Sequence, residues 1–308
     1  MLRLTYEVDV ADAYDGEKDA DKVMRRARDT VAQRLGRQAA SVSAEGREVV
    51  VDLVALQSDE LEIAKSVIVR PGRLQLEIVD DGGSGAVFGS LPEEALPPDS
   101  GIAIQQEVVP DGLDDGGKKK TVRAYYARVA CRPAKYPTES LRACLERFEG
   151  WASSRNPPAD HRIGFQAVTE PRSGGRLEQV GWRTLYLHAR AELTEGAVAD
   201  TSIGHDQGQN VGQTYVLLSF SPAGAARFEQ VTGANVNRRM AIVLDDIVDS
   251  APVIMTKIGG GKATITMGAG TPDKQEHDAR QLELVLRSGA LPAPLQLASE
   301  ETLPKGTK

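Results

Sequence analysis

The first part of the chain alternates between the two regular hydrophobic periods. Over residues 2–10 every second side chain is apolar, which predicts a strand with one buried face. Residues 19–35 carry apolar side chains at every fourth position, which predicts an amphipathic helix. A hairpin over 40–54, a helix from Ser58 and a strand over 73–78 follow from the same patterns. The order β-α-β-β-α-β is that of a ferredoxin-like unit.

The pattern weakens after a segment of Asp, Gly and Ser at residues 80–85, which is typical of a linker or turn. Residues 86–213 are rich in Pro, Gly and charge, so they are interpreted as a variable insertion. The elements expected within it are loops at 92–100 and 110–120, strands at 122–129 and 182–189, and a helix at 138–151.

Regular periods return from residue 214 onward. Pro222 stands where the first turn of a helix tolerates proline, and Gly289 stands where the last helix should end. The expected elements are strands at 215–219, 240–244, 253–254 and 263–267, helices from 222 and over 271–289, and an extended piece at 294–297.

Together these elements predict an α+β fold with two domains. The first is a ferredoxin-like base over residues 1–85, completed by a C-terminal strand at 292–303. The second is a larger α+β head over 86–291, in which the insertion 86–213 precedes a more regular unit at 214–291.

The composition and charge of the chain argue against some classes of protein, such as nucleic-acid-binding proteins. The chain has 308 residues with a net charge of −7, and this acidic balance argues against nucleic-acid binding. The basic cluster at 118–120 is interpreted as a solvated loop tip. No apolar run approaches the ~18 residues that span a bilayer, and no secretory signal is present. Aromatic residues make up only 5%, so the cores should consist mainly of aliphatic side chains.

The sequence contains no catalytic signature, so we expect neither an enzyme nor a bound metal or cofactor. No two histidines are spaced like metal ligands, and each is interpreted as structural or solvated. The glycine run before Lys262 lacks the earlier Gly and the following Ser or Thr of a phosphate loop. Three aspartates at 245, 246 and 249 follow a strand, where Asp suits turn geometry better than it indicates a cation site. The four histidines are His161, His188, His205 and His277.

The two cysteines, Cys131 and Cys144, allow two interpretations. In a reducing compartment they would be core thiols, and in an oxidising one they could close a short loop as a disulfide. Sequence alone leaves this open, because the distance between them is unknown.

Several short motifs carry a resemblance to a known family. Residues 241–246 read AIVLDD, 250–254 read SAPVI, 258–266 read IGGGKATIT and 284–295 read LVLRSGALPAPL. In this order and spacing they resemble the SecD family of the bacterial protein-export machinery. The resemblance is strong over 184–297, moderate over 1–80 and weak over 86–180. The family's usual Gly-Pro-Ser-Leu-Gly run after the last motif is replaced here by other residues.

The resemblance implies a location and a role. A SecD domain of this kind lies on the periplasmic side of the bacterial inner membrane, and we expect this chain to be such a domain without its membrane helices. The full-length protein would be membrane-embedded, with SecF, the SecYEG channel and unfolded secretory preproteins as partners. It would hold emerging preproteins and aid late export driven by the proton gradient. The alternative is an extracytoplasmic ligand-binding module unrelated to export, which would need a concave polar pocket.

Two sets of residues are expected to serve this role. A head that holds arbitrary clients needs modest apolar surface and accessible backbone groups. The expected contact surface is the hairpin at 244–254, and the alternative for that hairpin is a purely structural part. The contact residues are Leu244, Asp245, Ser250, Ala251, Pro252, Val253 and Ile254. The expected hinge residues, where the chain would cross between base and head, are Asp81, Gly82, Gly83, Gly85, Gly289, Pro292 and Pro294.

Overall fold

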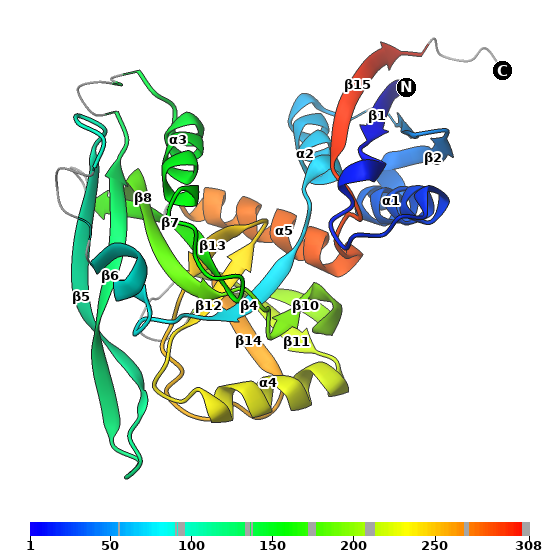
Figure 1. Ribbon diagram of the computed structural model, residues 1–308. Helices are drawn as coiled ribbons and strands as arrows, with labels where there is room; N and C mark the ends of the chain where they lie inside the picture. The colour runs from blue at the N-terminus through cyan, green and yellow to red at the C-terminus, as the bar shows by residue number, and fades with distance from the viewer. Residues whose placement is uncertain are drawn as a thin grey trace. The chain divides into compact units, whose positions relative to one another are not determined.

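The computed structural model describes residues 1–54, 56–89, 91, 96–132, 136, 138–171, 177–206, 213–267 and 271–303. The chain divides into two compact units (Figure 1). Unit 1 comprises residues 1–73 together with the C-terminal part from residue 278, and unit 2 comprises residues 74–277. Both contain helices and strands, so the α+β class expected from the sequence is confirmed.

Unit 1 contains one antiparallel sheet with the strand order β15-β1-β3-β2. Two helices pack against it, α1 along β2 and β3 and α2 against β15 (Figure 1). Asp19 caps α1 by accepting a hydrogen bond from the backbone N–H of Lys22. The elements are β1 (Leu2–Val8), α1 (Ala20–Leu35), β2 (Ala39–Glu45), β3 (Glu48–Leu53), α2 (Ser58–Val69) and β15 (Leu295–Thr302), with one-turn 3-10 helices at Val10–Asp12 and Gly36–Gln38.

The core of unit 1 follows from the two hydrophobic periods. On β1 the alternating residues Leu4, Tyr6 and Val8 are buried, and they meet the apolar stripe of α1. The strand expected at 73–78 is the exception. It forms β4 (Leu74–Ile78), which pairs with β12 in unit 2, and the position beside β1 is filled by β15. A short alternating run fits either sheet equally well, because its period says nothing about its partner.

Unit 2 is built on an eight-stranded sheet of order β5-β6-β8-β7-β13-β12-β4-β9 and a three-stranded sheet of order β10-β11-β14. All paired strands run antiparallel except β13 and β7. Its strands are β4 (Leu74–Ile78), β5 (Ile102–Leu113), β6 (Lys119–Ala130), β7 (His161–Pro171), β8 (Leu177–His188), β9 (Leu193–Thr194), β10 (Val198–His205), β11 (Thr214–Phe220), β12 (Met240–Leu244), β13 (Ile247–Ser250) and β14 (Lys262–Thr266). Its helices are a π-helical turn (Gly85–Gly89), α3 (Leu141–Ser153), a 3-10 turn (Glu195–Ala197), α4 (Pro222–Ala234) and α5 (Pro272–Ser288), which ends in unit 1.

The expected loop at 110–120 is wrong. The strands β5 and β6 form a long hairpin, and only residues 114–118 connect them. Pro110 and Gly112 suggested a loop, but the pairing shifts between Pro110 and Leu113, and this bulge accommodates both residues. Gly112 adopts a positive φ of 81° there. Of the other expected loop, at 92–100, residues 92–95 lie outside the described residues, and residues 96–100 form neither helix nor strand.

The start of α4 matches the sequence expectation. Ser221 accepts a hydrogen bond from the backbone N–H of Gly224, and Pro222 occupies the first turn. No helix among the described residues is both long and apolar enough to cross a bilayer.

The two cysteines form a disulfide, with 5.7 Å between the Cα atoms of Cys131 and Cys144. It joins the residue that follows β6 to the first turn of α3. Cys144 is fully buried in a cluster with Phe148, Phe165 and Trp182. The disulfide therefore ties α3 to the same core that its apolar face covers.

Removing this disulfide should destabilise unit 2. It closes a loop with a sequence separation of 13 residues, for which the chain-entropy estimate is ~3 kcal/mol. The variant with both cysteines replaced by Ser should unfold at lower urea, as followed by the fluorescence of Trp151 and Trp182. Dithiothreitol should lower the midpoint of the wild-type chain and leave that of the variant unchanged. Equal midpoints for the oxidised wild type and the variant would contradict the expectation.

Candidate functional site

An apolar groove of about 300 Å³ opens on the surface of unit 2. It lies between α4, the two sheets and the irregular segment that follows β13. Among the described residues that line it, Lys262 alone carries a charge. The lining consists of Leu76, Leu217, Phe228, Thr232, Met240, Ile242, Pro252, Val253, Ile254, Ile258, Lys262, Ala263 and Thr264.

One wall of the groove is fixed by backbone hydrogen bonds. The N–H of Met240 donates to the carbonyl of Pro252 at 2.9 Å, and the N–H of Ile254 donates to the carbonyl of Arg238 at 2.8 Å. Asn237 adds a bond from its N–H to the carbonyl of Ile254 at 2.7 Å. The segment therefore runs antiparallel to the entry of β12, although it is not a regular strand.

The opposite wall includes an edge strand. In the three-stranded sheet β14 pairs with β11 only, so its second edge has no strand partner among the described residues. Lys262, Ala263 and Thr264 on this strand line the groove. Two apolar residues in the segment before it, Met255 and Ile258, are 63% and 36% exposed. An unpaired edge beside apolar surface is the combination that β-augmentation requires.

The structure separates the expected contact residues into two groups. Pro252, Val253 and Ile254 line the groove, whereas the remaining four lie outside its lining. Leu244 ends β12, and Asp245 begins the turn to β13, where it and Asp246 have φ values of 51° and 69°. Short polar side chains suit this turn, which supports the interpretation of the aspartates as turn residues. Ser250 ends β13 and Ala251 follows it.

Sequence reasoning did not identify the rest of the groove. Phe228 and Thr232 lie four apart on α4, and Leu217 and Met240 belong to strands for which the sequence predicted no functional role. The i, i+4 spacing on α4 is the one local signal that was available. The other residues of the groove come together through strand pairing, and the hydrophobic periodicity of a strand does not determine its partner.

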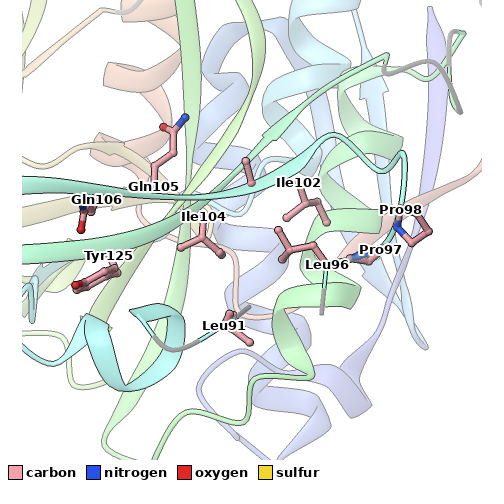
Figure 2. A pocket seen from close by; sticks show the side chains of 10 residues that line it. Leu91, Leu96, Pro97, Pro98, Ile102, Ile104, Gln105, Gln106 and Tyr125 are labelled. Atoms are coloured by element: carbon pink, nitrogen blue, oxygen red, sulfur yellow. The ribbon is translucent and has the colours of Figure 1, made fainter. Parts of the chain in front are cut away.

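A larger pocket of about 630 Å³ lies elsewhere in unit 2, along the β5–β6 hairpin (Figure 2). Ile102 and Ile104 on β5 face Leu91, Leu96 and the two prolines that follow Leu96. Gln105, Gln106 and Tyr125 supply its polar end. This pocket belongs to the segment with the weakest resemblance to known motifs, and it shares no residue with the apolar groove.

The expected hinge residues lie within the units and not at their boundary, which falls between residues 73 and 74 and again within α5. Asp81 is 4% exposed, and its carboxylate forms an ion pair with Arg239 just before β12. The N–H of Gly83 donates to the Asp80 carboxylate at 3.0 Å, which closes a tight turn. Gly82 and Gly85 belong to the same part of unit 2, and Gly289, Pro292 and Pro294 belong to unit 1. Their role as hinges stays a prediction.

A partly buried network of charged side chains surrounds Arg239, the residue that precedes β12. The Arg239 guanidinium donates to Asp81 at 2.9 Å and to Glu107 at 3.1 Å, and Arg183 donates to the same Glu107 carboxylate. Burial raises the pKa of Asp81, and the Arg239 charge only partly opposes this. Burial also acts to raise the pKa of Glu107, but hydrogen bonds from Arg183 and Arg239 outweigh it and lower the value. The network holds Arg239 beside Val253, with which it forms an isolated bridge.

Among the described residues, one group of potential metal ligands gathers in unit 2. The ligand atoms of Asp80, His161 and His188 all lie within 4.8 Å of one another. His161 and His188 face each other across the β7–β8 pair, a proximity that depends on strand register and not on sequence spacing.

Comparisons with known proteins agree on one family. Residues 173–293 match the family described as SecDF, P1 head subdomain. A protein translocase subunit SecD from Anaeromyxobacter dehalogenans is 31% identical over 257 residues, covering 79% of this chain and 39% of that protein. The SecD of Syntrophobacter fumaroxidans is 52% identical over 90 residues, covering 29% and 16%. The chain thus spans well under half the length of these relatives.

Solved structures share the fold. A structure described as a membrane component SecDF that enhances protein export aligns with a TM-score of 0.56 at 23% identity, covering 98% of this chain and 100% of that chain. A crystal structure of SecDF in a super-membrane-facing form aligns with a TM-score of 0.55 at 22% identity, covering 97% and 30%.

Proposed function

We propose, from the premise that this chain is a periplasmic domain of the SecD family, that unit 2 binds extended segments of unfolded preproteins in the apolar groove. The observation that carries the proposal is the groove itself, in which apolar side chains lie next to an edge of β14 that has no strand partner in the described part of the chain. An extended client would pair its backbone with β14 and place alternate side chains in the groove.

The chemistry of the groove suits a client of arbitrary sequence. Backbone pairing is the same for every residue except proline, and the aliphatic lining discriminates weakly among apolar side chains. Pro252 has no N–H to donate, and it lies on the wall facing β14. A client would therefore add to one wall and slide past the other, which favours weak and reversible binding. The sequence lacks a catalytic signature, in keeping with a binding role.

The proposal extends to the partners of the full-length protein and to the process in which it acts. The relatives are named as subunits of a protein translocase, and one of the matched proteins, from Thermus thermophilus, is named SecDF. We therefore propose that the whole protein acts with SecF beside the SecYEG channel, and that it aids late export driven by the proton gradient. Family membership argues against the alternative of a ligand-binding module unrelated to export.

Site-specific crosslinking tests the proposal. A photoreactive residue at Val253 in the full-length protein should crosslink to a secretory chain stalled halfway through the channel. The same residue at Arg142, whose side chain is 88% exposed on α3, should give no crosslink and controls for collision with unit 2. A second control at Glu62 lies on α2 in unit 1.

The pattern of crosslinks distinguishes the apolar groove from the larger pocket as the site of client binding. A crosslink from Ile102 in the larger pocket but not from Val253 would retain client binding and reject the groove. Crosslinks from none of these positions would contradict client binding by unit 2 altogether.

A further inference from the structure

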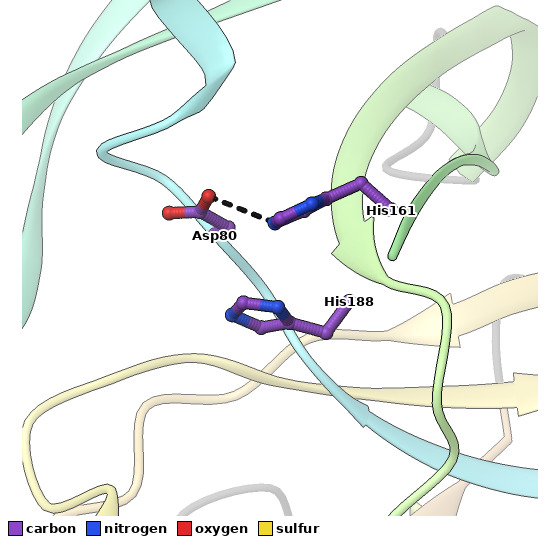
Figure 3. A group of neighbouring side chains, drawn as sticks. All are labelled: Asp80, His161 and His188. Atoms are coloured by element: carbon purple, nitrogen blue, oxygen red, sulfur yellow. Dashed lines mark hydrogen bonds and ion pairs between the residues drawn. The ribbon is translucent and has the colours of Figure 1, made fainter. Parts of the chain in front are cut away.

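Two histidines and an aspartate converge at one end of the β7–β8 hairpin in unit 2 (Figure 3). His161 begins β7 and His188 ends β8, and the register places them directly opposite each other. Asp80 comes from the segment that follows β4, and its backbone N–H donates to the carbonyl of Tyr186 at 2.9 Å. The three side chains point toward one another in Figure 3.

The distances are those of a ligand set. His161 Nε2 lies 3.1 Å from Asp80 Oδ2. Two ligand atoms about 2.1 Å from a tetrahedral zinc ion lie roughly 3.4 Å apart, so a small opening of this pair would admit the ion. His188 offers a third ligand atom within 4.8 Å of the other two. Two imidazoles and a carboxylate with an open fourth position form a common set for zinc.

Contacts from neighbouring residues hold two of these ligands, His161 and Asp80, in the required orientation. His161 Nδ1 lies 2.9 Å from Asp160 Oδ1, so a carboxylate orients the ring and leaves Nε2 directed at the cluster. The ring of His161 also stacks on Tyr186, with 4.6 Å between centroids and an interplanar angle of 4°. The Asp80 carboxylate is held through Oδ1 by the Gly83 N–H, which leaves Oδ2 for the ion. A Cβ at Gly83 would come within 2.1 Å of that oxygen.

We propose that Asp80, His161 and His188 bind a divalent transition-metal ion of the zinc type, with Asp160 as the orienting carboxylate. The ion would replace the direct hydrogen bond between Asp80 and His161. Asp80 and Asp160 bring two carboxylates to the site, which suits a dication. Bound metal would clamp the turn at residue 80 to the β7–β8 hairpin.

Metal titration of the chain, without a polyhistidine tag, tests the site. Isothermal calorimetry with Zn²⁺ should give one saturable site per chain. Co²⁺ should give the intense visible absorption of a four-coordinate ion. Asp80→Asn and His188→Gln should each weaken binding by more than roughly 100-fold, and Asp160→Asn by roughly 10–100-fold.

The matched control is His205→Gln, because His205 also lies near a carboxylate, with 3.6 Å between its Nε2 and Glu276, but belongs to β10 in the three-stranded sheet and not to the β7–β8 pair. This variant should bind Zn²⁺ like the wild type. Gly83→Ala should weaken binding without removing a ligand, because it displaces the Asp80 carboxylate. The fluorescence of the two tryptophans shows whether each variant is folded. No saturable site in the wild type, or equal affinity in His188→Gln, would overturn the proposal.

Discussion

Replacing Arg239 by Met should destabilise unit 2 by about 3–5 kcal/mol, because it leaves the Asp81 carboxylate buried without its partner. The Arg239 side chain is 13% exposed and that of Asp81 is 4% exposed, so water cannot take over the solvation of the charge. Glu107 would lose one of its two arginine partners as well. Urea unfolding followed by tryptophan fluorescence measures this loss, since both tryptophans of the chain lie in unit 2.

Two further variants isolate the cause. Arg239→Met combined with Asp81→Asn should recover part of the loss, because the second change removes the unpaired charge. Arg142→Met is the matched control, since Arg142 pairs with Glu146 on the exposed face of α3 and should contribute under about 0.5 kcal/mol. A loss at Arg239 no larger than that at Arg142 would show that the buried pair does not stabilise the unit.

The Arg239 variant also connects stability to the proposed client site. Arg239 forms the isolated bridge with Val253. The backbone carbonyl of the preceding residue, Arg238, accepts a hydrogen bond from the N–H of Ile254. Loss of the ion pair should therefore loosen the wall of the groove before it unfolds the whole unit. The proposed crosslink at Val253 should weaken in this variant even at urea concentrations at which tryptophan fluorescence remains native.

The hydrophobic periodicity and the capping residues of the sequence predicted those elements whose stabilising contacts lie close together in the chain. The helix α1, with its Asp19 cap and four-residue spacing, and the helix α4, with Pro222 in its first turn, follow from short-range rules that hold in any fold. The strand β4 was recognised as a strand but assigned to the wrong sheet. Its apolar alternation fits a partner in unit 1 or in unit 2, and only long-range packing decides between them.

The candidate sites depend on contacts that no local rule contains. Arg239 and Asp81 are separated by 158 positions, and Asp80 and His161 by 81. His161 and His188 become neighbours only through the register of β7 and β8. The sequence motif includes Pro252, Val253 and Ile254, which line the groove, and their role as contact residues stays a prediction. It could not locate the edge of β14, which becomes a groove wall only when the second sheet is assembled.

Replacing Arg34 by Met should destabilise unit 1 by about 3 kcal/mol, because several buried or partly buried carbonyls would lose their donor together. Arg34 is 2% exposed and lies near the end of α1. Its guanidinium donates to the carbonyl of Val67 at 2.7 Å and to that of Gly289 at 3.0 Å. It also donates to the carbonyls of Arg70 and Pro71 and to the Ser288 hydroxyl.

These acceptors lie at the C-terminal ends of two helices, α2 and α5, where the last carbonyls have no partner within their own helix. One arginine therefore satisfies two helix ends that are far apart in the chain. Arg34→Lys should retain only part of the stability, since an ammonium cannot match the planar fork of the guanidinium. Arg28→Met is the matched control on the same helix, because Arg28 is exposed and, among the described residues, forms an ion pair with its neighbour Asp29 alone.

Hydrogen exchange separates this effect from any change in unit 2. In Arg34→Met the amides of α1 should exchange with a free energy of opening lower by about 3 kcal/mol. The tryptophan signal of unit 2 should stay at its wild-type urea midpoint, because both tryptophans lie outside unit 1. Unchanged exchange in α1 would mean that the helix ends find other donors when the guanidinium is removed. A shifted tryptophan midpoint would mean that the two units unfold together, which would make Arg34 a determinant of the stability of unit 2 as well.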